Sequence, residues 1–190
     1  CSSLGFHGLC GGGGGFAEYT VFPVKFVHKI PDGLSYEKAA LIEPIAVAVH
    51  SLRTGRFLTG QSALVLGAGP IGLATIEALK AAGASLVIVM QRKSVRQDYA
   101  LRAGADIVID PNEVNVVEEV KRRTGGVGAD ISFETTGSKA GFDAGVESIR
   151  HDGTMVVTSI WENEVSINPN TFIFSEKTIV GTIAYRNEFP

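Results

Sequence analysis

The chain has 190 residues, enough for one domain and part of a second. Hydrophobic residues make up 45% and charged residues 19%, which is typical of a globular protein with a sizeable core and excludes a disordered chain. The net charge is −3, and the sequence has no basic stripe that could neutralise a phosphate backbone, so we expect no nucleic-acid partner. The longest apolar stretches have the length of strands, so we expect no membrane span.

The first residues and the cysteines indicate the compartment in which we expect the protein. Cys1 and Cys10 are the only two cysteines, too few for a disulfide framework. The first ten residues lack the charged start and apolar core of a signal peptide. We therefore expect a cytoplasmic protein. Because the chain does not begin with Met and ends directly after a predicted strand, we also expect it to be a piece of a longer protein.

The first 45 residues have a pattern of their own. A glycine run at residues 11–15 leads into residues 16–22, whose alternation predicts a half-buried strand. Turn signals follow at Pro23 and at residues 31–33. Ser35 is typical of a helix start, and Pro44 suits the first position of a second helix, which we expect to begin there.

From residue 60 the sequence alternates regularly between predicted strands and helices. We expect six strands at residues 62–66, 86–90, 107–109, 131–133, 155–160 and 178–183. We expect helices between them at residues 70–82, 94–102, 112–123 and 138–149. Strands that are apolar on both faces and alternate with helices predict an α/β fold with a parallel sheet covered on both sides. The pattern indicates a doubly wound Rossmann fold with six strands.

The strongest local motif is Gly67-Ala68-Gly69-Pro70-Ile71-Gly72, which follows a strand and opens a helix. Gly67 permits a tight turn, Gly69 lets the backbone approach a pyrophosphate, and Gly72 lets helix and strand pack closely. Pro70 suits the first helical position, where the missing N–H has no helical partner. The motif predicts that the helix start binds a dinucleotide, with a glycine-rich turn without a ligand as the alternative.

The end of the second strand bears on the choice of cofactor. NAD-binding folds usually carry an acid there for the ribose hydroxyls, but this chain has Gln91, followed by Arg92 and, a helical turn later, Arg96. A guanidinium can bind a 2′-phosphate with two hydrogen bonds, and Gln91 does not repel it. We therefore expect NADP to be preferred over NAD. In the alternative, Gln91 bonds the ribose hydroxyls and Arg92 is a solvated surface charge.

Five motifs in a consistent order reveal a resemblance to a known family. They lie at residues 14–19, 41–50, 67–72, 133–137 and 181–190. Together they resemble the zinc-dependent medium-chain dehydrogenases, on the branch of sorbitol dehydrogenase and (R,R)-butanediol dehydrogenase. The resemblance runs through nearly the whole chain. It implies that residues 1–44 are the C-terminal part of a β-rich, GroES-like catalytic domain and that residues 45–190 are the NAD(P)-binding Rossmann domain.

The resemblance also implies site residues. Those expected to bind the cofactor are Gly67, Gly69, Pro70, Ile71, Gly72, Gln91, Arg92, Arg96, Thr136, Thr158, Ser159, Ile160, Thr182, Ile183 and Ala184. Because NAD-dependent members also tend to have Arg at the position of Arg96, Arg92 is the more diagnostic of the two.

Two residues match positions near the substrate. Glu43 matches an acid beside the zinc-bound water, and a helix cap is the alternative. Tyr185 matches a tyrosine near the substrate, and a packing residue is the alternative. The polyol enzymes carry Arg just before this tyrosine, whereas this chain has Ala184 before it and Arg186 after it. This difference weakens a sorbitol-like assignment and favours the butanediol branch, whose ending this chain reproduces.

The resemblance places the zinc sites mostly outside this chain. Cys1 matches the last of four cysteines that hold a structural zinc, but the other three are absent here. The ligands of the catalytic zinc, a Cys and a His-Glu pair, lie upstream of residue 1. Cys10 has no counterpart in the family. We expect structural roles for His7, His28 and His151, and a satisfied interior position for His50.

The implied reaction is the oxidation of a secondary alcohol to a ketone, or its reverse, by hydride transfer with NAD(P) in a zinc-containing full-length enzyme. We expect a small alcohol or ketone as substrate, a dimer or tetramer as assembly, and no turnover by this chain alone. Alternatives are a zinc-free quinone or enoyl reductase of the same architecture, a non-enzymatic dinucleotide-binding regulator and, more remotely, a methyltransferase.

Overall fold

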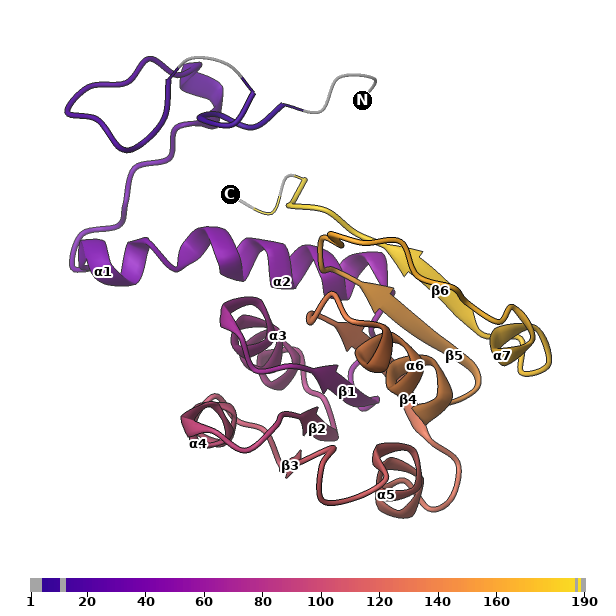
Figure 1. The fold of residues 1–190 in the computed structure, drawn as a ribbon. Helices are drawn as coiled ribbons and strands as arrows, with labels where there is room; N and C mark the ends of the chain where they lie inside the picture. The colour runs from indigo at the N-terminus through magenta and orange to yellow at the C-terminus, as the bar shows by residue number, and fades with distance from the viewer. Residues whose placement is uncertain (1–4, 11–12, 187, 189–190) are drawn as a thin grey trace.

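The computed structural model describes residues 5–10, 13–186 and 188. Its centre is a sheet of six strands (Figure 1). They are β1 (Ser62–Leu66), β2 (Leu86–Met90), β3 (Ile107–Ile109), β4 (Ala129–Glu134), β5 (Ile149–Val157) and β6 (Thr178–Gly181). The strand order is β3-β2-β1-β4-β5-β6, and all neighbouring strands are parallel. This is the doubly wound Rossmann arrangement that the alternating pattern predicts.

Helices cover both faces of the sheet. The main ones are α2 (Ile42–Thr54), α3 (Pro70–Ala81), α4 (Val95–Arg102), α5 (Val116–Arg123) and α6 (Lys139–Ser148). Short helical turns add η1 (Val24–Phe26), α1 (Tyr36–Ala39) and α7 (Asn170–Ile173). Within the described part of the chain, no helix has both the length and the apolar character needed to cross a membrane.

The core follows from the alternation of side chains along the strands. Ala63 and Val65 of β1 belong to the cluster that packs against α2, α3 and α4. Leu64 and Leu66 of the same strand point to the opposite face, in the cluster that includes Val120 of α5. These four residues of β1 are fully buried, which explains why the strand is apolar from Ala63 to Leu66.

Most predicted helices and strands have the expected places, and side chains at the caps explain their starts. β1, β2 and β3 have the predicted bounds. The side chains of Ser94, Asn115 and Ser138 each accept a backbone hydrogen bond at the start of α4, α5 and α6. As a result, α5 begins four residues later than residue 112. β5 begins at Ile149, six residues earlier than predicted.

Two expectations for the first 45 residues are wrong. Residues 16–22 form no strand, and Tyr19 and Val21 are 91% and 94% exposed. A strand needs a neighbour for its backbone hydrogen bonds, and no described segment pairs with this one. The second helix begins at Ile42, not at Pro44, which lies within its first turn, where N–H groups have no helical partner in any case. The expected domain boundary after residue 44 therefore falls inside α2.

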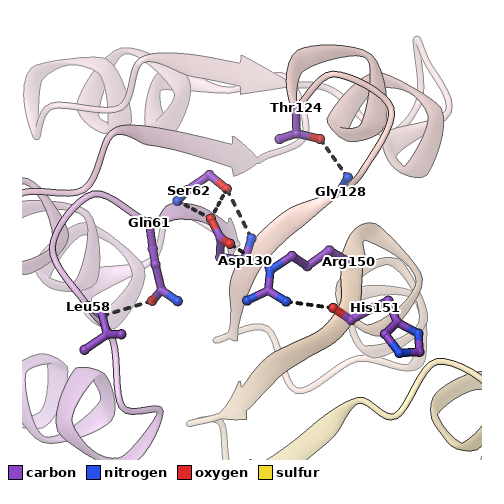
Figure 2. Close-up of polar contacts among 8 residues, drawn as sticks. All are labelled: Leu58, Gln61, Ser62, Thr124, Gly128, Asp130, Arg150 and His151. Atoms are coloured by element: carbon purple, nitrogen blue, oxygen red, sulfur yellow. Dashed lines mark hydrogen bonds and ion pairs between the residues drawn. The ribbon is translucent and has the colours of Figure 1, made fainter.

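At the amino ends of the central strands, Asp130 joins β1, β4 and β5 (Figure 2). Its Oδ2 accepts hydrogen bonds from the backbone N–H of Ser62 at 2.8 Å and from the Ser62 hydroxyl at 2.7 Å. Its Oδ1 accepts one from Nε of Arg150 at 2.8 Å. Burial raises the pKa of Asp130, but these hydrogen bonds and the charge of Arg150 lower it by more, so the net shift is downward. The network links the amino ends of three strands, at the edge of the sheet opposite the glycine turn.

We expect Asp130→Asn to lower the free energy of unfolding by about 1.5–3 kcal/mol at neutral pH, the range for a hydrogen bond to a charged group. Because the pKa of Asp130 is lower in the folded state, its contribution is complete above the unfolded pKa of about 3.9 and is lost as the pH falls through the folded value. The difference between variant and wild type should therefore shrink below about pH 4. Urea unfolding at several pH values measures this. As a control, Asp143→Asn removes an exposed ion pair with Lys139 and should cost less than about 0.5 kcal/mol.

Candidate cofactor site

The carboxyl ends of the strands lie in one row. Leu66 at the end of β1 is in register with Met90 of β2 and Glu134 of β4, and Glu134 is in register with Val157 of β5, which pairs with Gly181 of β6. The residues that follow these strand ends therefore meet at one edge of the sheet. All fifteen predicted cofactor residues lie in the segments that leave this edge: after β1, β2, β4, β5 and β6. In Rossmann folds, ligands bind at this edge.

The glycine turn after β1 has the shape of an open cradle. Gly67 has a φ of 98°, which favours glycine. A Cβ on Gly72 would lie 2.1 Å from the carbonyl oxygen of Gly67, so only glycine allows this contact between turn and helix. A Cβ on Gly69 would meet no atom within 4 Å. Gly69 is the N-cap of α3 and Pro70 its first residue, and no side chain caps this helix start. The described residues therefore leave the N–H groups of this helix start without a side-chain partner, and such groups, with the helix dipole, favour an anion.

Gln91 ties the glycine turn to the loop after β2. Its Oε1 accepts a hydrogen bond from the backbone N–H of Ala68 at 2.9 Å, and its Nε2 donates to the carbonyl oxygen of Arg92 at 2.9 Å. Arg92, Lys93 and Arg96 are exposed beside it and form no ion pair with any described residue. The loop and the first turn of α4 thus present three cations, of which Lys93 is not among the residues predicted from the sequence.

Glu134, the last residue of β4, is fully buried and organises the two neighbouring loops. Its Oε1 accepts hydrogen bonds from the backbone N–H groups of Thr136 at 2.7 Å and Gly137 at 3.0 Å, and from the Thr136 hydroxyl. Its Oε2 accepts one from the Ser159 hydroxyl after β5. Four donors satisfy the carboxylate, so the buried charge is compensated. Glu134 is not among the predicted site residues, although an acid at the end of an apolar strand is a signal for such a network.

The segments after β5 and β6 complete the edge. Ser159 is half-buried, whereas the apolar side chains of Ile160 and Ile183 are 83% and 49% exposed. The hydroxyl oxygen of Thr182 is buried and has no hydrogen-bond partner among the described residues. A hollow of about 420 Å³ lies between Ile160 and Thr136. Exposed apolar side chains and an unpartnered buried hydroxyl fit a site that a larger, partly apolar group covers when bound.

The charge of Glu43 acts on the phenol of Tyr185. The pKa of Tyr185 is raised, first by partial burial and second by the negative charge of Glu43. Glu43 is exposed in the first turn of α2, whose N-cap is Leu41 and whose start has no side-chain cap. Glu43 is therefore not the cap of this helix, and that alternative is wrong.

The expected metal and histidine positions have different outcomes. Cys1 lies outside the described residues. In the part of the chain that is described, no three His, Cys, Asp or Glu side chains gather to hold a metal ion. Cys10 is an exposed free thiol. His50, expected to be a satisfied interior histidine, is half-buried and pairs with Glu188 through its Nδ1 at 3.0 Å.

Comparison with known proteins identifies relatives. A family model described as zinc-binding dehydrogenase matches residues 70–190. The chain is 45% identical over 188 residues to an (R,R)-butanediol dehydrogenase of Bacillus subtilis, covering 98% of this chain and 54% of the relative. It is 34% identical over 178 residues to a sorbitol dehydrogenase of the same organism, covering 93% and 50%. The X-ray structure of 2R,3R-butanediol dehydrogenase from Bacillus subtilis matches with a TM-score of 0.90 and 44% identity, over 96% of this chain and 52% of that one. The chain thus spans about half the length of the curated relatives it matches.

The strand order and the glycine turn at the carboxyl end of the central strand define a Rossmann-type α/β domain. With 121 of its 190 residues matched by the family model, the chain belongs to the zinc-binding dehydrogenases. The expected fold class and the expected family are both confirmed.

Proposed function

We propose that this chain is the cofactor-binding part of an NAD(P)-dependent dehydrogenase that interconverts a secondary alcohol, of the diol or polyol type, and a ketone. The observation that carries the proposal is the open cradle at residues 67–72, located where the strand order reverses between β1 and β4. Similarity to proteins named butanediol and sorbitol dehydrogenases supports an alcohol substrate. It also favours a dehydrogenase over a zinc-free reductase or a regulator.

The roles of the residues follow from their positions. The backbone amides at the start of α3 bind the pyrophosphate, and the exposed side chains of Ile160 and Ile183 cover the nicotinamide and exclude water. The bound nicotinamide supplies hydride transfer at its ring. Glu43 and Tyr185 hold the substrate hydroxyl, since both match positions near the substrate in the family and the charge of Glu43 acts on the Tyr185 phenol. The other predicted residues line the same cofactor path.

Zinc belongs to the longer protein in this proposal. The family is named for zinc, but the described residues provide no set of ligands for it. Cys1 is proposed as one of four sulfur ligands, whose partners would lie upstream. We propose the same division for the chain, with residues 1–44 in a catalytic domain and residues 45–190 in the cofactor domain. A cytoplasmic dimer or tetramer is proposed as well.

NADP is the proposed cofactor of choice, because Arg92, Lys93 and Arg96 surround the end of β2 without a carboxylate at position 91. We expect Gln91→Glu to raise the ratio of the Kd for NADP to the Kd for NAD about tenfold, since the carboxylate would repel a 2′-phosphate while keeping the oxygen that accepts from Ala68. Titration calorimetry with both cofactors measures this ratio. Gln61→Glu, at the opposite edge of the sheet, is the matched control and should leave it unchanged. Tighter binding of NAD by the wild type would contradict the preference.

The reaction itself is tested on the full-length protein. We expect it to oxidise 2,3-butanediol or sorbitol. The absorbance of the reduced nicotinamide measures the rate of this oxidation. Residues 1–190 alone should bind the cofactor but oxidise neither alcohol. Binding of the cofactor without oxidation of any secondary alcohol by the full-length protein would contradict the proposed activity.

A further inference from the structure

The segment after β6 folds back over α2 and is fastened there by a buried acid (Figure 1). The side chain of Glu188 is only 2% exposed. Its Oε1 accepts from Nδ1 of His50 at 3.0 Å and lies 3.2 Å from a guanidinium nitrogen of Arg53. Its Oε2 accepts from the backbone N–H of Arg186. A buried carboxylate with two charged or polar partners on one helix is a specific attachment, because its burial is compensated only in this position.

The same helix carries Glu43. Glu43 and His50 are seven residues apart in α2, which places them on one face of the helix, about 10.5 Å apart along its axis. Tyr185 is three residues before Glu188, and its phenol is influenced by the charge of Glu43. The tail that carries Tyr185 is therefore attached to the face of α2 on which Glu43 lies.

The backbone just before Tyr185 shows that this placement requires support. Ala184 has a φ of 50°, a left-handed conformation that is disfavoured for a residue with a Cβ. Upstream, Thr182 is already held by the hydrogen bond of its N–H to the carbonyl oxygen of Val157 at 3.0 Å. Because the strained turn lies between this bond and Glu188, attachment on both sides stabilises it.

We infer that His50, Arg53 and Glu188, called here the Glu188 cluster, act as positioning residues that hold the tail with Tyr185 against α2, the helix that carries Glu43, for binding of the substrate. The inference rests on the proposed function for its catalytic consequence, but the attachment itself does not depend on it. The hydrogen bonds of Glu188 go to His50, Arg53 and Arg186, and Thr182 keeps its own bond to Val157, so loss of the cluster affects the orientation of the alcohol more than the affinity for the cofactor.

The attachment is tested first, without reference to activity. Arg186 is exposed between Tyr185 and Glu188, so trypsin can report on opening of this segment. In the full-length protein, Glu188→Ala should speed tryptic cleavage after Arg186 about tenfold, and Glu188→Gln by less. Glu176→Gln, which changes an exposed Glu–His contact at the amino end of β6, is the matched control and should have no effect. Equal cleavage of wild type and Glu188→Ala would overturn the inference.

The positioning role is tested by a double-mutant cycle with Tyr185→Phe. Glu188→Ala should raise KM for the alcohol about tenfold while the Kd for the cofactor changes less than about twofold. In the Tyr185→Phe background, Glu188→Ala should have almost no further effect, because the group that it positions is already absent. Additive effects would overturn the positioning role. If Tyr185→Phe alone has no effect while cleavage is accelerated, the proposed role of Tyr185 fails and the attachment stands.

Discussion

Replacing Gly72 with Ala should destabilise the protein by about 3 kcal/mol, or roughly 6–12 °C in Tm for a chain of this size. The added Cβ would lie 2.1 Å from the carbonyl oxygen of Gly67 and 3.0 Å from its carbonyl carbon. These are backbone atoms of the turn that connects β1 to α3, so no side-chain rotation can relieve the clash. Thermal unfolding of the protein without cofactor measures the effect.

Two other glycines serve as matched controls for this prediction. Gly181→Ala in β6 meets no atom within 4 Å and should change stability by less than about 1 kcal/mol. Gly69→Ala is equally free of clashes, and its φ of −77° is accessible to alanine. It should cost less than about 1 kcal/mol in stability but weaken cofactor binding at least about tenfold, because its methyl group fills the space before the helix start. Full cofactor affinity in Gly69→Ala would contradict the cradle as the phosphate site.

The second large effect is expected at Glu134. Glu134→Ala should lower the free energy of unfolding by about 3 kcal/mol, because it removes a fully buried side chain and leaves partly buried donors of Thr136, Gly137 and Ser159 without an acceptor. Glu134→Gln should cost only about 1–2 kcal/mol, since it keeps one acceptor oxygen and the shape of the side chain. Chemical denaturation of both variants gives the comparison.

The same variants separate a structural from a functional effect of Glu134. The loops that it joins carry Thr136 and Ser159, both proposed to line the cofactor. Glu134→Gln should therefore weaken cofactor binding several-fold under conditions in which the protein remains folded. Glu119→Gln, a surface acid that pairs with Arg122 and Arg123 within α5, is the control and should not affect the cofactor. Equal stability of wild type and Glu134→Ala would show that the network contributes nothing.

The parts of the fold that depend on local sequence were predictable. β1, β2 and β3 are short apolar runs between turn signals, and their bounds agree with the prediction. Gly83 follows α3 in a left-handed conformation, which is typical of a glycine just after the end of a helix. The prediction of a strand over residues 16–22 was wrong. Alternation of side chains shows which face a strand would bury, but a strand also needs a neighbour for its backbone hydrogen bonds, and no described segment supplies one.

The networks of charged side chains were not predictable in the same way. Glu134 accepts from Ser159, and Glu188 reaches His50, across 25 and 138 residues of sequence. Such contacts depend on strand order and on the path of the tail. A single sequence shows that an acid is present in an apolar setting, but it does not show which donors satisfy it.

By itself, the sequence determined the alternation of strands and helices, the glycine turn and the family, because each depends on residues close together in the chain or on a motif order. Only the tertiary structure decided which distant side chains share the carboxyl edge, and that Glu188 attaches the tail after β6 to His50 of α2. The reason is physical: parallel strands in register bring their ends together, and a buried charge is stable only where the fold supplies its partners.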